Sequence, residues 1–122
     1  MGKKILIVDD EVDLIETLAF RLEANGYDVA MAFDGQEGYD RARKERPDLI
    51  ILDLMLPKMD GYKVCGLLKA DARYSKIPII IFTARAQESD RKMGEEAGCD
   101  AYVTKPFDPP ALLAKIKELI KG

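Results

Sequence analysis

The stretch Leu49-Ile50-Ile51-Leu52-Asp53 places four consecutive large aliphatic residues directly before a carboxylate. An apolar run this short is typical of a strand buried on both faces, in the middle of a parallel sheet that helices cover. Asp53 then lies at the carboxyl end of that strand, at the edge of an open α/β sheet where ligands bind. Asp53 is therefore a candidate functional residue, although a solvated aspartate that merely ends a strand fits this stretch equally well.

The composition indicates one soluble globular domain over residues 1–122, because 48% of the residues are hydrophobic and 34% are charged. The net charge is -3, and no cluster of Lys and Arg is long enough to predict a nucleic-acid surface. The chain has no histidine, and Cys65 and Cys99 lie far apart, so a zinc site has little support. We expect two buried, reduced thiols in a cytoplasmic protein without direct contact to nucleic acid or membrane.

Short apolar runs alternate with stretches of helical length. The fourth helix, at about residues 87–97, is the weakest, because Met93 and Ala97 are its only expected core contacts and Gly94 costs roughly 1 kcal/mol relative to Ala. Five alternations predict a doubly wound, five-stranded parallel sheet with right-handed crossovers. The strands are expected at residues 5–8, 29–32, 49–52, 79–82 and, more weakly, 101–103.

Polar side chains follow four of the five strands. Residues 9–11 are Asp-Asp-Glu, Asp53 and Thr83 end the third and fourth strands, and Lys105 closely follows the fifth. The ends of parallel strands meet at one sheet edge, so we expect these groups to converge. Clustered carboxylates repel one another unless a cation intervenes, and all-oxygen ligands favour Mg²⁺, with Mn²⁺ as a substitute. The added lysine and threonine suit a phosphate, so the set predicts a phosphoryl-transfer site.

Five motifs make the chain resemble the receiver domain of two-component response regulators, the CheY-like family. The resemblance covers essentially the whole chain and implies a flavodoxin-like fold with five flanking helices and strand order 2-1-3-4-5. The motifs are Asp9-Asp10-Glu11, the residues LDLMLP at 52–57, MDG at 59–61, Thr83-Ala84, and Lys105-Pro106-Phe107.

The resemblance implies that Asp53 accepts a phosphoryl group from a sensor histidine kinase or a phosphotransfer protein of a phosphorelay. Asp10 would bind Mg²⁺ directly and Asp9 through water, and Asp53 and the Met55 carbonyl would complete the protein's ligands. Such a chain is no enzyme in the usual sense, since it catalyses only its own phosphorylation and slow dephosphorylation.

Three further residues are assigned by the same resemblance. Thr83 and the Ala84 amide would hold the phosphoryl oxygens. Lys105 would pair with the phosphate and precede a cis peptide to Pro106, whereas Glu11 is expected only to start the first helix.

Phosphorylation is expected to draw Thr83 inward and let Tyr102 turn toward the core, which would alter the face made by the fourth helix, fifth strand and fifth helix. An output protein or domain would read this face. Tyr102 could instead be an ordinary strand aromatic that half covers the core.

Two positions flank the line along which hydrolytic water would approach. Met55 and Arg85 are both bulky and poorly suited to orient water, which predicts slow dephosphorylation. Either side chain could instead be an ordinary loop residue.

A phosphorylation-dependent dimer through the same face is a further expectation. Arg91, Asp100 and Lys115 fit the pattern of receivers that pair in this way, but Ala101 and Ala111 stand where that class commonly has acidic partners. A full symmetric salt-bridge network is therefore not expected.

Two alternatives stay open. A haloacid-dehalogenase-like phosphatase also uses an aspartate nucleophile with Mg²⁺, but it needs an acid/base aspartate where this chain has Met55. A pseudo-receiver would serve only as a binding module. The retained site residues count against it: Asp9, Asp10, Asp53, Thr83 and Lys105.

Overall fold

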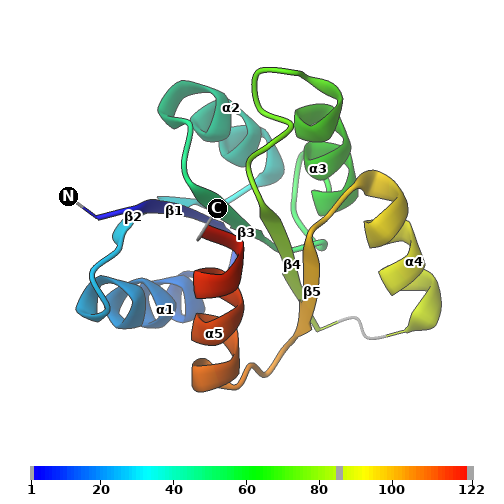
Figure 1. The fold of residues 1–122 in the computed structure, drawn as a ribbon. Helices are drawn as coiled ribbons and strands as arrows, with labels where there is room; N and C mark the ends of the chain where they lie inside the picture. Colours follow the sequence, from blue (N-terminus) through cyan, green and yellow to red (C-terminus); the bar gives the residue numbers. More distant parts are fainter. Residues whose placement is uncertain (1, 85–86, 121–122) are drawn as a thin grey trace.

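The chain folds into a parallel β-sheet with helices covering both faces, as Figure 1 shows for the computed structural model. The structure describes residues 2–84 and 87–120. The strand order β2-β1-β3-β4-β5, with every pairing parallel, confirms the predicted topology. In chain order the elements are β1 (Lys4–Val8), α1 (Val12–Ala24), β2 (Asp28–Ala32), α2 (Gly35–Glu45), β3 (Leu49–Leu52), α3 (Gly61–Ala70), β4 (Ile79–Thr83), α4 (Glu88–Ala97), β5 (Ala101–Thr104) and α5 (Pro109–Ile120).

The core consists of two layers, one on each face of the sheet. Side chains of α2 and α3 pack on one face, and side chains of α1 and α5 pack on the other. Successive residues of β3 alternate between them: Ile50 and Leu52 belong to the first layer, and Leu49 and Ile51 to the second. This alternation explains why four consecutive aliphatic residues are all buried.

The loop after β3 returns closely to the sheet edge. The Asp60 side chain caps α3 by accepting a hydrogen bond from the Lys63 amide at 2.9 Å. A Cβ on Gly61 would lie 2.3 Å from the Asp53 carbonyl oxygen, so only glycine lets the helix begin this close to the strand end. The first turn of α3 therefore holds the backbone that carries Asp53.

The register of α4 differs from the prediction in one respect. Met93, expected in the core, is 49% exposed, whereas Gly94 is buried and Ala97 packs against the first core layer. A Cβ on Gly94 would lie 3.2 Å from Cys99 Sγ and 3.4 Å from a ring carbon of Tyr102. The missing side chain thus lets α4 approach β5 closely, which turns Met93 outward.

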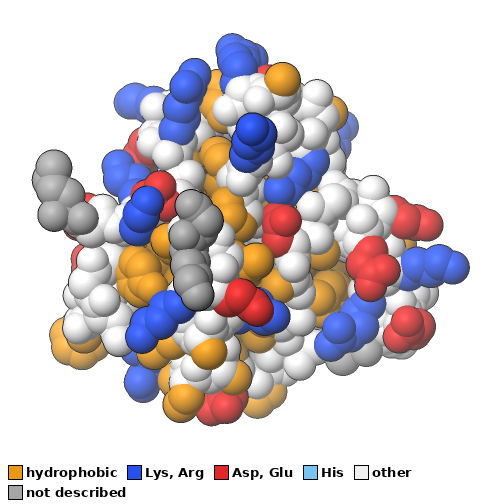
Figure 2. Space-filling view, viewed as in Figure 1, with side chains coloured by type: hydrophobic (Ala, Val, Ile, Leu, Met, Phe, Trp, Pro, Cys, Tyr) orange, Lys and Arg blue, Asp and Glu red, His pale blue; other side chains and the backbone are white. Residues whose placement is uncertain are grey.

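Basic side chains gather over α2 and α3, as Figure 2 shows. Several of them are paired with acids: Arg43 lies 2.7 Å from Asp40, and Arg41 pairs with Glu45. The expectation that the chain does not contact nucleic acid stays a prediction.

The helices and the two cysteines bear on whether the chain has a membrane span or a disulfide bond. Among the described residues, none of the helices has the length and apolar character needed to cross a bilayer. Cys65 and Cys99 are free, as expected, but only Cys65 is buried, whereas Cys99 is half-buried at the turn before β5. Burial raises the pKa of the Cys65 thiol to about 12.

Candidate functional site

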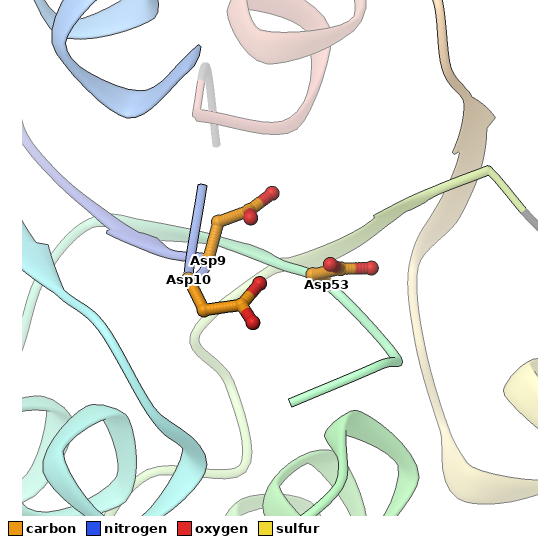
Figure 3. A group of neighbouring side chains, drawn as sticks. All are labelled: Asp9, Asp10 and Asp53. Atoms are coloured by element: carbon orange, nitrogen blue, oxygen red, sulfur yellow. The ribbon is translucent and has the colours of Figure 1, made fainter. Parts of the chain in front are cut away.

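Three carboxylates from two neighbouring strands meet at the sheet edge. Asp9 and Asp10 directly follow β1, and Asp53 directly follows β3, whose Leu52 pairs with Val8. The Asp53 amide donates to the Val8 carbonyl at 3.0 Å, which extends the pairing to the acidic residue itself. One carboxylate oxygen from each aspartate lies within 4.8 Å of the others. In Figure 3 the three side chains extend toward the same side.

Lys105 reaches into this cluster from the loop after β5. Its ammonium lies 2.7 Å from Asp9 Oδ2 and 3.5 Å from Asp53 Oδ2. The ammonium also lies 5.3 Å from the centre of the Phe82 ring, which itself makes an edge contact with Phe107. The expected cis peptide between Lys105 and Pro106 is present.

Glu11 joins the cluster through a contact that the sequence did not predict. It does precede α1 as expected, but its side chain makes no cap hydrogen bond to that helix. Its Oε1 lies 2.7 Å from Lys105 Nζ instead. The available signal was the spacing: a carboxylate only two residues after Asp9 stays close enough to reach the same cation, and the Glu11 amide donates to Asp9 Oδ1 at 2.9 Å.

Burial and mutual repulsion shape the ionisation of the cluster. Burial raises the pKa of the Asp9 carboxyl and the Asp53 charge adds to this effect, while hydrogen bonds from Lys105 and from the Glu11 amide oppose it. Burial tends to lower the pKa of the Lys105 ammonium, but its bonds to Asp9 and Glu11 and the charge of Asp53 raise it overall. One lysine thus contacts three carboxylates, Asp10 lies beside two of them, and the cluster is short of positive charge.

This donor set fits a hard divalent cation. The three aspartates offer only oxygen ligands, and their charges are not balanced by the single ammonium. A pocket of about 590 Å³ opens beside the cluster, with Asp10 on one side and Met55, Pro57 and Met93 on others. Of the three aspartates, Asp10 lines this pocket, so the cluster is open to solvent on the Asp10 side.

The other predicted site residues lie around the same edge. Thr83 is fully buried at the end of β4, Ala84 after it is exposed, and the Lys105 amide donates to the Thr83 carbonyl at 2.8 Å. Met55 is 58% exposed, and its amide lies 3.4 Å from Asp53 Oδ1. Arg85, the second residue expected to affect the lifetime, lies outside the described residues.

Tyr102 lies away from the carboxylates, half-buried on β5 and packed against the first core layer. The Arg91 guanidinium lies 5.0 Å from the centre of its ring. The switching role assigned to Tyr102 stays a prediction.

The residues expected in a dimer contact all have partners within the chain. Asp100 lies 2.9 Å from Lys69 Nζ and accepts a hydrogen bond from the Ile79 amide at 2.8 Å. Lys115 lies 3.0 Å from Glu118. A charged dimer network would first have to break these contacts, and the dimer stays a prediction.

Comparison with known proteins places this geometry in a family. The sequence model of the response regulator receiver domain matches residues 5–117. The chain is 46% identical to the alkaline phosphatase synthesis transcriptional regulatory protein PhoP of Bacillus subtilis over 99% of this chain and 50% of that protein. It is 44% identical to the DNA-binding dual master transcriptional regulator RpaA of Synechocystis over 97% of this chain and 49% of that protein. The chain thus spans about half the length of these curated relatives.

Solved structures agree with this result. Chemotaxis protein CheY4 of Vibrio cholerae is 29% identical and superposes with a TM-score of 0.91, covering 98% of this chain and 99% of that one. The receiver domain of the Pseudomonas aeruginosa sensor histidine kinase PA1611, described with a magnesium ion coordinated in its active-site cleft, is 31% identical with a TM-score of 0.92 over 100% of both chains. From its sequence match, its strand order and the carboxylates at its sheet edge, this chain belongs to the response regulator receiver domain family.

Proposed function

We propose that the chain is a phosphoacceptor that takes a phosphoryl group on Asp53 from the phosphohistidine of a sensor histidine kinase or phosphotransfer protein. The observation that carries this proposal is the convergence of Asp9, Asp10, Asp53 and Lys105 at one sheet edge. A structural role alone would not require these buried charges to gather, since burying like charges together costs stability.

Asp53 is the nucleophile in this reaction. One of its carboxylate oxygens attacks phosphorus, the bond between phosphorus and the imidazole nitrogen of the donor breaks, and the leaving imidazole takes up a proton from solvent. The product is an acyl phosphate on Asp53. The Asp53 side chain is only 6% exposed, so little hydration has to be removed from its carboxylate before it attacks.

The neighbouring residues bind and orient the reactants. Asp9, Asp10, Asp53 and the Met55 carbonyl would hold Mg²⁺, which supplies neutralisation of phosphoryl charge when bound. Lys105 supplies a second positive charge beside Asp53. The Thr83 hydroxyl and the Ala84 amide would hold the remaining phosphoryl oxygens.

An output protein or domain would receive the signal through the face of α4, β5 and α5. The relatives named above are transcriptional regulators about twice as long as this chain. We infer that the natural context of this domain includes a partner or a further domain that responds to phosphorylation, and gene regulation is one such output.

Two alternatives have specific weaknesses. A haloacid-dehalogenase-like phosphatase needs an acid/base aspartate two residues after the nucleophile, and this chain has the exposed Met55 at that position. A pseudo-receiver would gain nothing from the charged cluster around Lys105.

Incubation with Mg²⁺ and a small phosphodonor such as acetyl phosphate tests the proposal. The intact mass should increase by one phosphoryl group in the wild type and not at all in Asp53→Asn. Asp40→Asn provides the control, because Asp40 is an exposed carboxylate of α2 that pairs with Arg43 outside the cluster, and its loss is expected to leave phosphorylation on Asp53 intact. Consumption of the donor without a mass increase would support the phosphatase, and no reaction would support the pseudo-receiver.

The lifetime of the phosphorylated form is expected to depend on Met55. A Met55→Asn substitution should speed dephosphorylation by about tenfold, equivalent to roughly 1.4 kcal/mol of barrier, because a carboxamide can orient water and a thioether cannot. The decay is followed by mass spectrometry after the donor is removed. Met93→Asn changes a comparably exposed methionine of the same pocket and should leave the decay rate unchanged. Equal decay in wild type and Met55→Asn would refute this role.

The output face should loosen when Asp53 carries a phosphate analogue such as beryllium trifluoride. The described part of α4 has few buried side chains, and Gly94 weakens it, so its protected amides should exchange about tenfold faster in hydrogen–deuterium exchange, equivalent to roughly 1.4 kcal/mol. α1 serves as the internal reference. Unchanged exchange throughout α4 and β5 would rule out this route of signalling.

A further inference from the structure

The Lys105 ammonium lies at unequal distances from its three acidic neighbours. The ammonium lies 2.7 Å from both Asp9 and Glu11 but 3.5 Å from Asp53, the residue at which phosphate charge would develop. The lysine is thus drawn toward the β1–α1 segment and away from the acceptor.

The two closer carboxylates differ sharply in their surroundings. The Asp9 side chain is 2% exposed, and its other oxygen accepts a hydrogen bond from the Glu11 amide at 2.9 Å. The Glu11 side chain is 61% exposed. Removing the cation from Asp9 would leave a buried charge uncompensated, whereas a released Glu11 carboxylate is simply hydrated.

We propose that Glu11 is a positioning residue that holds Lys105 away from Asp53 before phosphoryl transfer and gives it up as charge develops there. This inference rests on the proposed function and assigns Glu11 a role within it. Because the exposed contact is the cheaper one to break, Lys105 releases Glu11, keeps Asp9 and shortens its existing 3.5 Å contact to Asp53.

The position of Glu11 in the fold supports this role. It directly precedes α1, yet its side chain does not cap the helix, so the ion pair with Lys105 is its main described interaction. It also lines a second pocket of about 430 Å³ together with Ala84, Lys105 and Phe107. The carboxylate therefore has room to turn into solvent after release.

If Glu11 holds Lys105 away from Asp53, removing the Glu11 contact should increase the rate at which Asp53 is phosphorylated. Phosphorylation of Asp53 by acetyl phosphate in the presence of Mg²⁺ should become about two- to fivefold faster in Glu11→Gln, the range expected for loss of one partly exposed ion pair. Glu11→Asp keeps the negative charge but shortens the side chain by one methylene, and it should be accelerated similarly. Asp13→Asn removes the same charge from the first turn of α1 without touching Lys105 and should react at the wild-type rate.

A second readout follows the lysine without any phosphodonor. The side-chain carboxyl ¹³C resonance of Asp53, assigned by its loss in Asp53→Asn, should shift in both Glu11 variants as the ammonium approaches, and should stay unchanged in Asp13→Asn. Wild-type rates and an unshifted Asp53 resonance in the Glu11 variants would overturn the proposal. Acceleration in Glu11→Gln alone would also overturn it, because the charge of Glu11 rather than its contact would then be responsible.

The two readouts separate this inference from the proposed function. If the wild-type chain takes up no phosphoryl group, the proposed function fails, and the carbon resonance alone decides whether Glu11 holds Lys105. If the wild type is phosphorylated and the Glu11 variants match it in both readouts, only the positioning role fails.

Discussion

The ion contacts of Lys105 are the interaction on which the functional edge depends. A single ammonium from the loop after β5 joins Asp9, Glu11 and Asp53, which come from two other parts of the chain. Without a cation there, the buried Asp9 and Asp53 carboxylates would repel each other in a region with little water. The same contacts leave the cluster net acidic, and this imbalance makes the edge suitable for a divalent cation and an incoming phosphoryl group.

The packing of the sheet fixes the position of Asp53 at this edge. β3 is buried on both faces, so its end is fixed by packing on both sides, and the start of α3 at Gly61 closes against the Asp53 carbonyl. The acceptor thus lies at the end of a strand that is packed on both faces. The proposed output element α4 is the opposite case, because its described side chains are mostly exposed. A tightly packed acceptor strand and a loosely packed output helix suit a domain that changes shape in response to one covalent modification.

Much of this could be predicted from the sequence, for physical reasons that are visible in particular residues. Leu49 to Leu52 could only be buried in a central strand, and parallel strands bring Asp9, Asp53 and Lys105 to one edge whatever their separation along the chain. Met93 and Glu11 could not be placed correctly in the same way. The outward turn of Met93 depends on the close contact of Gly94 with Cys99 and Tyr102, and the role of Glu11 depends on the reach of Lys105. Both are tertiary contacts that periodicity and spacing along one segment do not specify.

The central claim is that the carboxylate cluster needs more positive charge than Lys105 provides, and the free energy of unfolding as a function of Mg²⁺ concentration tests it most directly. Mg²⁺ should stabilise the wild-type chain by about 2.7 kcal/mol once the free ion exceeds its dissociation constant a hundredfold, and sodium chloride of equal ionic strength should not. Asp10→Asn, which removes an exposed ligand and leaves the Lys105 contacts in place, should abolish most of this gain. Equal stabilisation by the two salts, or an undiminished effect of Mg²⁺ in Asp10→Asn, would contradict the account.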